Sequence, residues 1–244
     1  MMLPVSLLAL LLGLVTTLVA ATVQGTIGFG FAVLSVPVLS LLDRKMAPVP
    51  QLLIALPLTL SMLWRERQAV DLRGVAWVLA GRLPGAALGV LLLKIGHPAL
   101  LDLLLATVVL AAVAIVGSSA TVQRNRLTEL FAGVASGTFA LLASIGGPPL
   151  ALLYRDAPPE TLRATLAALF SIGLLITLSA RLLAHEIHLT DLRVAAWLLP
   201  ALLLGLWISR WTIGRVGQRS LKAAILIVSA IAAAGLVTRA LLRW

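Results

Sequence analysis

Apolar runs about as long as a lipid bilayer is thick recur along the whole chain, and they constrain its fold more than any other feature. A helix needs about twenty apolar residues to cross about 30 Å of hydrocarbon. Runs close to this length occupy residues 3–24, 74–93, 100–117, 161–183, 193–213 and 220–240. Only 11% of the residues are charged, whereas a soluble domain carries about a quarter. The sequence therefore predicts an all-α polytopic membrane protein.

Shorter apolar segments at 26–42, 48–64, 128–143 and 147–154 complete the pattern. The last is too short to cross a bilayer alone. Hydropathy gives eight crossings at most, or ten membrane segments if the regions around 25–37 and 137–149 each count as a pair. The first run lacks the charged leader of a signal peptide and is too long for its apolar core, so it is expected to remain as a membrane helix.

The net charge of +10 would suggest nucleic-acid binding in a soluble protein. Here the basic residues stand singly or in small groups between apolar runs, where lysine and arginine determine membrane topology. No nucleic-acid partner is expected. The absence of cysteine excludes disulfides and thiolate metal sites.

Glycine and proline interrupt the apolar sequence at two places, Gly25–Pro37 and Gly137–Pro149. In hydrocarbon every backbone N–H and C=O needs a partner, so unwound backbone survives only where protein buries it or where it lines a wet cavity. The helix that follows such a break presents unpaired N–H groups and partial positive charge, which suits an anion. The alternative is close helix packing, because small residues also let membrane helices approach each other.

The expected binding site lies between the two breaks. Backbone near Gly28–Gly30 and Gly146–Gly147 would hold an anion, and hydroxyl groups would orient it. The candidate substrate-binding residues in the breaks are Gly25, Thr26, Gly28, Gly30, Pro37, Gly137, Thr138, Ser144, Gly146, Gly147 and Pro148.

Arg82 is a further candidate, because it lies in the middle of the run 74–93. An arginine at that depth costs a few kcal/mol or more unless it faces a partner or water. It could be the counter-charge of an anionic substrate, or it could pair with a carboxylate or with carbonyl groups freed by Pro84. Both interpretations remain open.

The two halves of the chain resemble each other. At an offset of 112, Gly25-Thr26 falls on Gly137-Thr138 and Pro37 on Pro149; at 120, Asp71-Leu72-Arg73 falls on Asp191-Leu192-Arg193. Between them, at 116, Arg65 falls on Arg181. We expect a first membrane repeat at 1–117, a basic linker at 118–127 and a second repeat at 128–244, a construction common in transporters.

The number of segments in each repeat decides their relation. Five would make the repeats inverted in the membrane, and four would make them parallel. Ten segments place Arg65, Arg67, Arg73, Arg124, Arg126, Arg155, Arg163, Arg210, Arg215, Arg219 and Lys222 on one side. The other side receives Arg44, Lys45, Lys94, Arg181, Arg193, Arg239 and Arg243. The larger set favours the first side as cytoplasmic, with both termini outside.

No motif indicates an enzyme. His185 and His188 are three residues apart in a polar loop, whereas the zinc-protease motif needs histidines four apart on a helix. A nucleophile motif, a phosphate loop and paired carboxylates within the spans are all lacking. Neither a metal nor an organic cofactor is expected.

The two breaks resemble those of the TauE/SafE family of sulfite-exporter-like permeases. The similarity rests on Gly25–Phe31 followed by Val36-Pro37, on Ser136-Gly137 with Ile145–Leu150, and on Arg163-Ala164-Thr165. It covers essentially the whole chain. It implies a multi-pass permease of the bacterial inner membrane, with an internal duplication, that moves sulfite, sulfonates or related small organic anions. Some relatives carry a denser run of glycines at the first break, which Thr26 and Phe29 interrupt here.

The sequence thus predicts transport of a small anion across the lipid bilayer by alternating access. The alternative is a non-transporting assembly or scaffold protein whose glycines only pack helices. The coupling ion, whether proton or sodium, and a homo-oligomeric state are left open.

Overall fold

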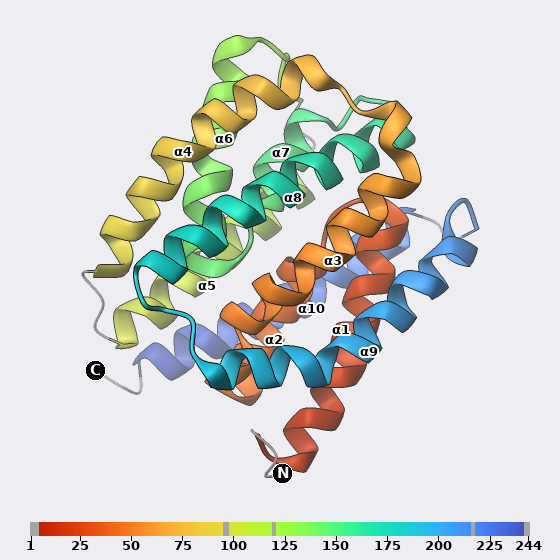
Figure 1. The fold of residues 1–244 in the computed structure, drawn as a ribbon. Coiled ribbons are helices and arrows are strands. Elements are labelled where there is room, and N and C mark those ends of the chain that lie inside the picture. Colours follow the sequence, from red (N-terminus) through yellow and green to blue (C-terminus); the bar gives the residue numbers. More distant parts are fainter. Residues whose placement is uncertain (1–4, 95–97, 119–120, 216–217, 242–244) are drawn as a thin grey trace.

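The computed structural model describes residues 5–94, 98–118, 121–215 and 218–241, and these form ten α-helices and no strand (Figure 1). The helices are α1 (Leu7–Ile27), α2 (Phe31–Leu42), α3 (Val49–Glu66), α4 (Leu72–Lys94), α5 (Pro98–Gly117), α6 (Arg126–Ala143), α7 (Gly147–Leu153), α8 (Pro159–Leu183), α9 (Leu189–Thr212) and α10 (Gln218–Leu241). Two 3-10 turns, η1 (Arg44–Met46) and η2 (Arg67–Ala69), flank α3. The side chains of Arg219, Lys222, Arg239 and Arg243 lie outside the described part of the chain.

Helices from the two halves of the chain pack against each other in pairs. The most extensive contacts join α4 with α6, α1 with α9, α5 with α10 and α3 with α8. The pair of α3 and α8 is antiparallel, because Glu66 at the end of α3 meets Arg163 near the start of α8. The two halves are therefore interleaved rather than side by side.

Glycines bring α4 and α6 into backbone contact. A Cβ atom at Gly81 would lie 2.1 Å from the carbonyl oxygen of Leu130, and one at Gly85 would lie 2.2 Å from that of Val134. Gly133 faces α4 in the same way. This is the small-residue packing by which membrane helices associate, since lipid offers no hydrophobic driving force between them.

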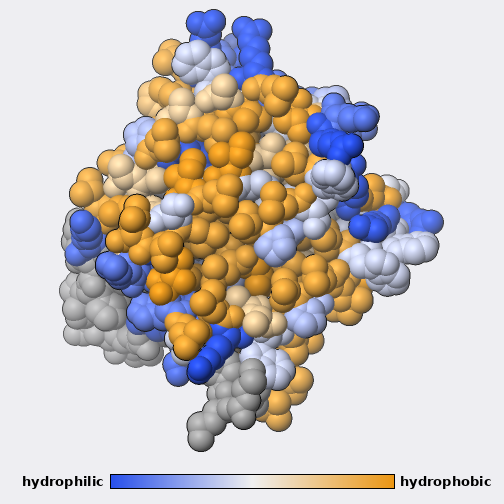
Figure 2. Space-filling view, viewed as in Figure 1, coloured by the Kyte–Doolittle hydropathy of each residue, from blue (hydrophilic) through white to orange (hydrophobic). Residues whose placement is uncertain are grey.

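The outer surface is apolar, as a membrane span requires. Within the described residues, five helical stretches are long and apolar enough to cross a bilayer: Leu7–Ile27, Arg44–Ala69, Leu72–Leu92, Pro159–Leu183 and Leu189–Thr212. Large hydrophobic side chains on α1, α4, α8 and α9 are exposed, and Figure 2 shows them covering most of one face, with hydrophilic residues near its margins. The chain is a multi-pass membrane protein, as expected.

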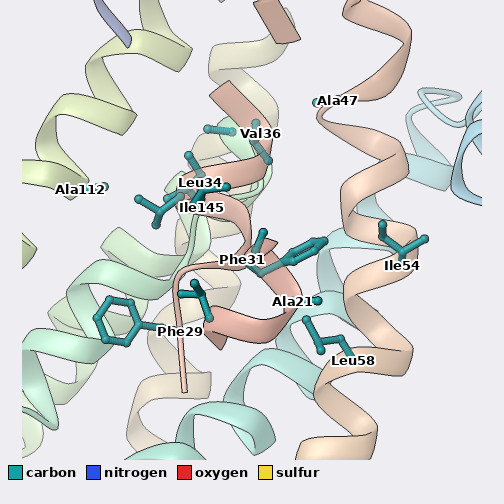
Figure 3. Packing of buried hydrophobic residues seen from close by; sticks show 14 of the residues in the cluster. Ala21, Phe29, Phe31, Leu34, Val36, Ala47, Ile54, Leu58, Ala112 and Ile145 are labelled. Carbon is teal, nitrogen blue, oxygen red and sulfur yellow. The ribbon is translucent and has the colours of Figure 1, made fainter. Parts of the chain in front are cut away.

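Helix α2 lies in the middle of the core. Its residues Phe31, Val36 and Leu39 are buried, and Figure 3 shows Phe31 directed toward Ile54 and Leu58 of α3. Most other residues of this helix are buried too. The buried start of this short helix positions the first glycine break inside the protein.

Candidate functional site

The first break separates α1 from α2 at Gly28-Phe29-Gly30. Gly28 has φ 97° and Gly30 has φ 113°, values that side-chain-bearing residues rarely adopt, so glycine is needed at both positions. The side chain of Gln24 reaches across the break, and its Oε1 accepts a hydrogen bond from the N–H of Phe31 at 3.1 Å. The first intrahelical hydrogen bond of α2 runs from the N–H of Leu34 to the carbonyl oxygen of Gly30. The N–H groups of Ala32 and Val33 therefore have no helical partner.

The second break, between α6 and α7, is built differently. Ser144 adopts φ 60° and ends α6, and its hydroxyl donates to the carbonyl oxygen of Pro48 at 3.2 Å. Helix α7 begins Gly147-Pro148-Pro149. Since proline has no N–H, Gly147 supplies the only backbone donor among these three positions. The two breaks resemble each other in sequence, but the second offers far fewer donors to an anion.

A hollow of about 480 Å³ lies between the two breaks. Five of the expected binding residues line it: Gly30, Arg82, Ser144, Gly146 and Gly147. The other polar residues in its wall are Gln24 and Thr59, and much of the rest is apolar, including Phe31, Leu52, Phe170 and Leu174. The hollow is therefore a mainly apolar chamber with one cation and a few polar groups.

Arg82 is the cation of this hollow, and it is 2% exposed. Its Nη1 donates to the hydroxyl of Ser136 at 2.9 Å, and that hydroxyl donates to the carbonyl oxygen of Gly146 at 2.6 Å. No carboxylate of the described residues pairs with Arg82. Of the two interpretations of this arginine, the structural pair with a carboxylate is thus not seen in this part of the chain.

Gly173 of α8 makes room for the Arg82 side chain. A Cβ atom at Gly173 would lie 2.2 Å from Cζ, 2.3 Å from Nη2 and 2.4 Å from Nε of Arg82. The guanidinium lies in the notch that this glycine leaves. Its position is therefore fixed by Ser136 on α6 and by Gly173 on α8.

Several expected binding residues lie away from the hollow. The Thr26 hydroxyl bonds the carbonyl of Thr22 and the hydroxyl of Thr212, and that of Thr138 bonds the carbonyls of Gly85 and Val134. Gly25 packs on Ser209, and Gly137 packs on the backbone of Arg82. These residues join neighbouring helices, as the packing alternative describes.

Two prolines and one glycine of the expected set have other neighbours. Pro37 lies within α2, where its missing N–H leaves the carbonyl of Val33 without a helical partner; Ser229 of α10 donates to this carbonyl at 2.8 Å. Pro148 is buried at the start of α7. Gly28 abuts Arg163, whose Cα would lie 3.1 Å from an added Cβ.

A second hollow of about 640 Å³ lies beside the first break, on the side of Arg163. Phe29 lines this hollow, whereas Gly30 and Phe31 line the central one, and Figure 3 shows the two phenylalanine rings pointing to opposite sides. Nε of Arg163 donates to both carboxylate oxygens of Glu66, at 2.9 and 3.0 Å. This ion pair joins the end of α3 to the start of α8 next to the Gly28 turn.

A polar network ties the loops together at the same end of the molecule. Arg124 donates to Asp71, to Glu129 at 3.2 Å and to the hydroxyl of Tyr154 at 3.4 Å. Burial acts to raise the pKa of Asp71, but hydrogen bonds from Arg124 and from the N–H of Gly74 outweigh it and hold this pKa below its ordinary value. Burial raises the pKa of the Tyr154 hydroxyl.

The histidine pair of the polar loop shows no metal-site geometry. His188 is the N-cap residue of α9, its backbone N–H donates to Oδ2 of Asp191 at 2.8 Å, and its Nδ1 lies 3.6 Å from that oxygen. Within the described residues, no group of three or more histidine, aspartate or glutamate side chains could hold a metal ion.

Sequence reasoning missed Gln24, Ser136, Gly173 and the pair of Glu66 with Arg163. A glutamine in an apolar run directly before the break, and a glycine in the middle of the run 161–183, were signals that could have identified two of them. The contacts of Ser136 and Glu66 join residues far apart in the chain, and sequence alone does not reveal them.

An apolar exterior, helices broken within the core and a hollow whose wall contains the buried cation Arg82 define a multi-pass membrane protein with polar groups in its interior. The family model for the sulfite exporter TauE/SafE matches residues 12–236, and the chain belongs to this family. The resemblance inferred from the glycine and proline motifs is thus confirmed. No curated protein and no solved structure matches the chain. Membership in this family indicates a membrane transporter.

Proposed function

We propose that this protein transports a small anion, sulfite, a sulfonate or a related organic anion, and binds it in the hollow between the two breaks. The observation that carries the proposal is Arg82, a buried cation in the wall of that hollow with only a neutral hydroxyl as its described partner. Burying an arginine within a membrane protein is costly unless a counter-charge or water meets it. An anionic substrate supplies that counter-charge.

The other groups in the hollow suit an oxyanion. Ala32 and Val33 line it at the first turn of α2, where N–H groups lack helical partners and the helix dipole is positive. The Gly147 N–H at the start of α7 and the Gln24 side chain are further polar groups at its wall. The apolar remainder of the wall would favour the organic part of a sulfonate, or would leave a bare anion with few competing waters.

The proposal includes an internal duplication with inverted halves. Helices α1 and α6 end 116 residues apart, at Ile27 and Ala143, and α2 and α7 begin 116 residues apart, at Phe31 and Gly147. This register differs by four residues, about one helical turn, from the offset of 112 that aligns Gly25 with Gly137. The crosswise pairing of α1 with α9 and of α4 with α6 further supports two equivalent halves.

Contacts of the basic residues support inversion. Arg65 reaches the end of α1 and Arg181 reaches the end of α6, at opposite ends of the antiparallel pair of α3 and α8. The two ends of the proposed pathway would then be equivalent by pseudosymmetry. Rocking of one half against the other would open the central hollow to each side in turn, in the membrane of a bacterial cell.

The test uses purified protein in proteoliposomes and in detergent. We expect Arg82→Gln to abolish uptake of labelled sulfite and to reduce strongly the rise in melting temperature that sulfite causes in the wild type, since a ligand stabilises the folded state it binds. Arg82→Lys should retain part of both, because a lysine keeps the charge but not the planar fork. Unchanged uptake in Arg82→Gln would refute the proposal.

The packing glycines of α4 and α6 favour a second function, a membrane scaffold that transports nothing. A screen of melting temperature against sulfite, sulfate, sulfonates and carboxylates distinguishes the two. A scaffold predicts no stabilisation by any of them. A transporter predicts stabilisation that depends on Arg82.

A further inference from the structure

Arg181, near the end of α8, is buried at 3% exposure although it lies far from Arg82 in the chain. Its Nη2 donates to the carbonyl oxygen of Leu141 in the last turn of α6. Its Nε is buried and has no hydrogen-bond partner in the structure. An unpaired buried donor costs about 1–3 kcal/mol, and more for a charged group, so an acceptor at this nitrogen would stabilise the protein.

A hollow of about 450 Å³ adjoins this arginine. Lys94, Arg181 and Glu186 are the charged residues that line it, and the remaining wall is apolar. Figure 1 shows the final turns of α4 and α8, which carry Lys94 and Arg181, next to each other. No ion pair joins these three residues in the described part of the chain, and the two cations outnumber the one carboxylate.

Arg65 makes the matching contact at the end of α1, and there a carboxylate of the chain lies beside the arginine. Its Nη2 donates to the carbonyl of Gly25 at 2.9 Å, and its Nε also lacks a partner. Gly25 and Leu141 both lie two residues before the end of their helix. At this end, however, the carboxylate of Glu66 lies 3.4 Å from Nη2 of Arg65 and also binds Arg163.

The residue after Arg181 is Leu182, which is 63% exposed and carries no charge. The chain therefore places its own carboxylate beside Arg65 but none within ion-pair distance of Arg181, among the residues described. We propose that the hollow at Lys94 and Arg181 is a second anion subsite, at the opposite end of the molecule from the Glu66–Arg163 pair. It takes a small oxyanion, held by the positive charges of Arg181 and Lys94, the two cations that line the hollow. As a station on the transport pathway, it rests on the proposed function.

The test measures sulfite and sulfate binding to the detergent-solubilised full-length protein by isothermal titration calorimetry. In Arg82→Gln, which lacks the central cation, we expect one weaker site to remain. Adding Lys94→Gln to that variant should weaken the remaining site about fivefold, the scale of a partly exposed charge pair. Adding Arg181→Gln should weaken it tenfold or more, as expected for a charge-assisted hydrogen bond.

Controls separate binding from folding. Lys94 makes no described hydrogen bond or ion pair. Lys94→Gln therefore removes a charge and leaves the hydrogen bond from Arg181 to the carbonyl oxygen of Leu141 in place. Lys45→Gln is the matched control, because Lys45 is also exposed and precedes α3 at the same end of the α3–α8 pair. It should leave binding unchanged.

The outcomes distinguish the two proposals. If Arg82→Gln abolishes all anion binding, or if Lys94→Gln and Lys45→Gln have equal effects, the second subsite is refuted while the central site stands. If Arg82→Gln leaves binding and transport unchanged and Lys94→Gln alone weakens binding, the second subsite holds and the proposed function fails.

Discussion

Gly173→Ala tests the central site through geometry rather than charge. The added methyl group would lie 2.2 Å from Cζ of Arg82, whereas ordinary contacts of this kind begin near 3.4 Å. The guanidinium would have to retreat by about 1 Å. Its hydrogen bond to Ser136, now 2.9 Å, would then exceed the 3.5 Å beyond which little of a hydrogen bond remains.

The expected magnitude follows from that displacement. A hydrogen bond to a charged group contributes about 1.5–3 kcal/mol, so misplacing Arg82 should reduce anion affinity by about 10- to 150-fold. The fold should survive, because the displaced atoms are the far end of a flexible side chain. Sulfite-dependent stabilisation and uptake into proteoliposomes measure the first effect, and the melting temperature without ligand measures the second.

The matched control is Gly117→Ala, where the nearest atom to the added Cβ lies 3.6 Å away. It should bind sulfite as the wild type does. A double-mutant cycle with Arg82→Gln completes the test, since residues that act through one contact are not additive. Wild-type affinity in Gly173→Ala, or fully additive losses in the cycle, would refute the role assigned to Arg82.

Four further outcomes are expected. Ser136→Ala should weaken anion binding about tenfold and lower stability, because Arg82 and the carbonyl of Gly146 both lose a partner. Unchanged hydrogen exchange at residues 144–147 would contradict the role of Ser136 at the second break. Gly85→Ala should destabilise the protein by about 1–3 kcal/mol or prevent assembly, because the added methyl meets the rigid carbonyl of Val134 at 2.2 Å; a melting temperature equal to that of Gly117→Ala would show that α4 and α6 do not pack so closely. Thr26→Val and Thr138→Val should keep anion affinity and lose about 1 kcal/mol of stability each, since their hydroxyls bond neighbouring helices. A loss of anion affinity without a loss of stability would show that these hydroxyls bind the anion. The lowered pKa of Asp71 means that its stabilising effect is complete above its unfolded pKa of about 3.9 and disappears as pH falls through its lower folded value. The melting temperature of Asp71→Asn should therefore fall less on acidification than that of the wild type. An equal fall in both proteins would exclude this role.

The helices were predictable because membrane crossing imposes a length on each apolar run. The helix boundaries at the first break were harder to predict. The sequence suggests that the first helix stops at residue 24, yet α1 continues through Gly25 and Thr26 to Ile27. Tertiary contact explains the difference, since Gly25 allows Ser209 of α9 to approach and Thr26 bonds Thr212. A glycine in a membrane helix can mark a break or a close contact, and sequence alone does not distinguish them.

The central residues of the hollow were predictable for a related reason. Gly30, Gly146 and Gly147 adjoin the ends of helices, where closely spaced glycines, or glycines followed directly by two prolines, disfavour a continuous helix. Arg82 was identified because a lone arginine in an apolar run is rare. The environment of its guanidinium was not predictable, because the Ser136 hydroxyl and the Gly173 notch belong to two other helices.

The link from Arg82 through Ser136 to Gly146 suggests how an anion could affect the conformation of the second break. Helix α7 starts with two prolines, so its first turn offers an anion little direct hold. Arg82 instead reaches the break indirectly, since the same hydroxyl that accepts from its Nη1 donates to the carbonyl of Gly146. An anion that draws the guanidinium toward the hollow therefore changes the partner on which that carbonyl depends. A ligand shifts a conformational equilibrium only through interactions that differ between its states, and this chain of two hydrogen bonds provides such a difference without any contact between the anion and α7.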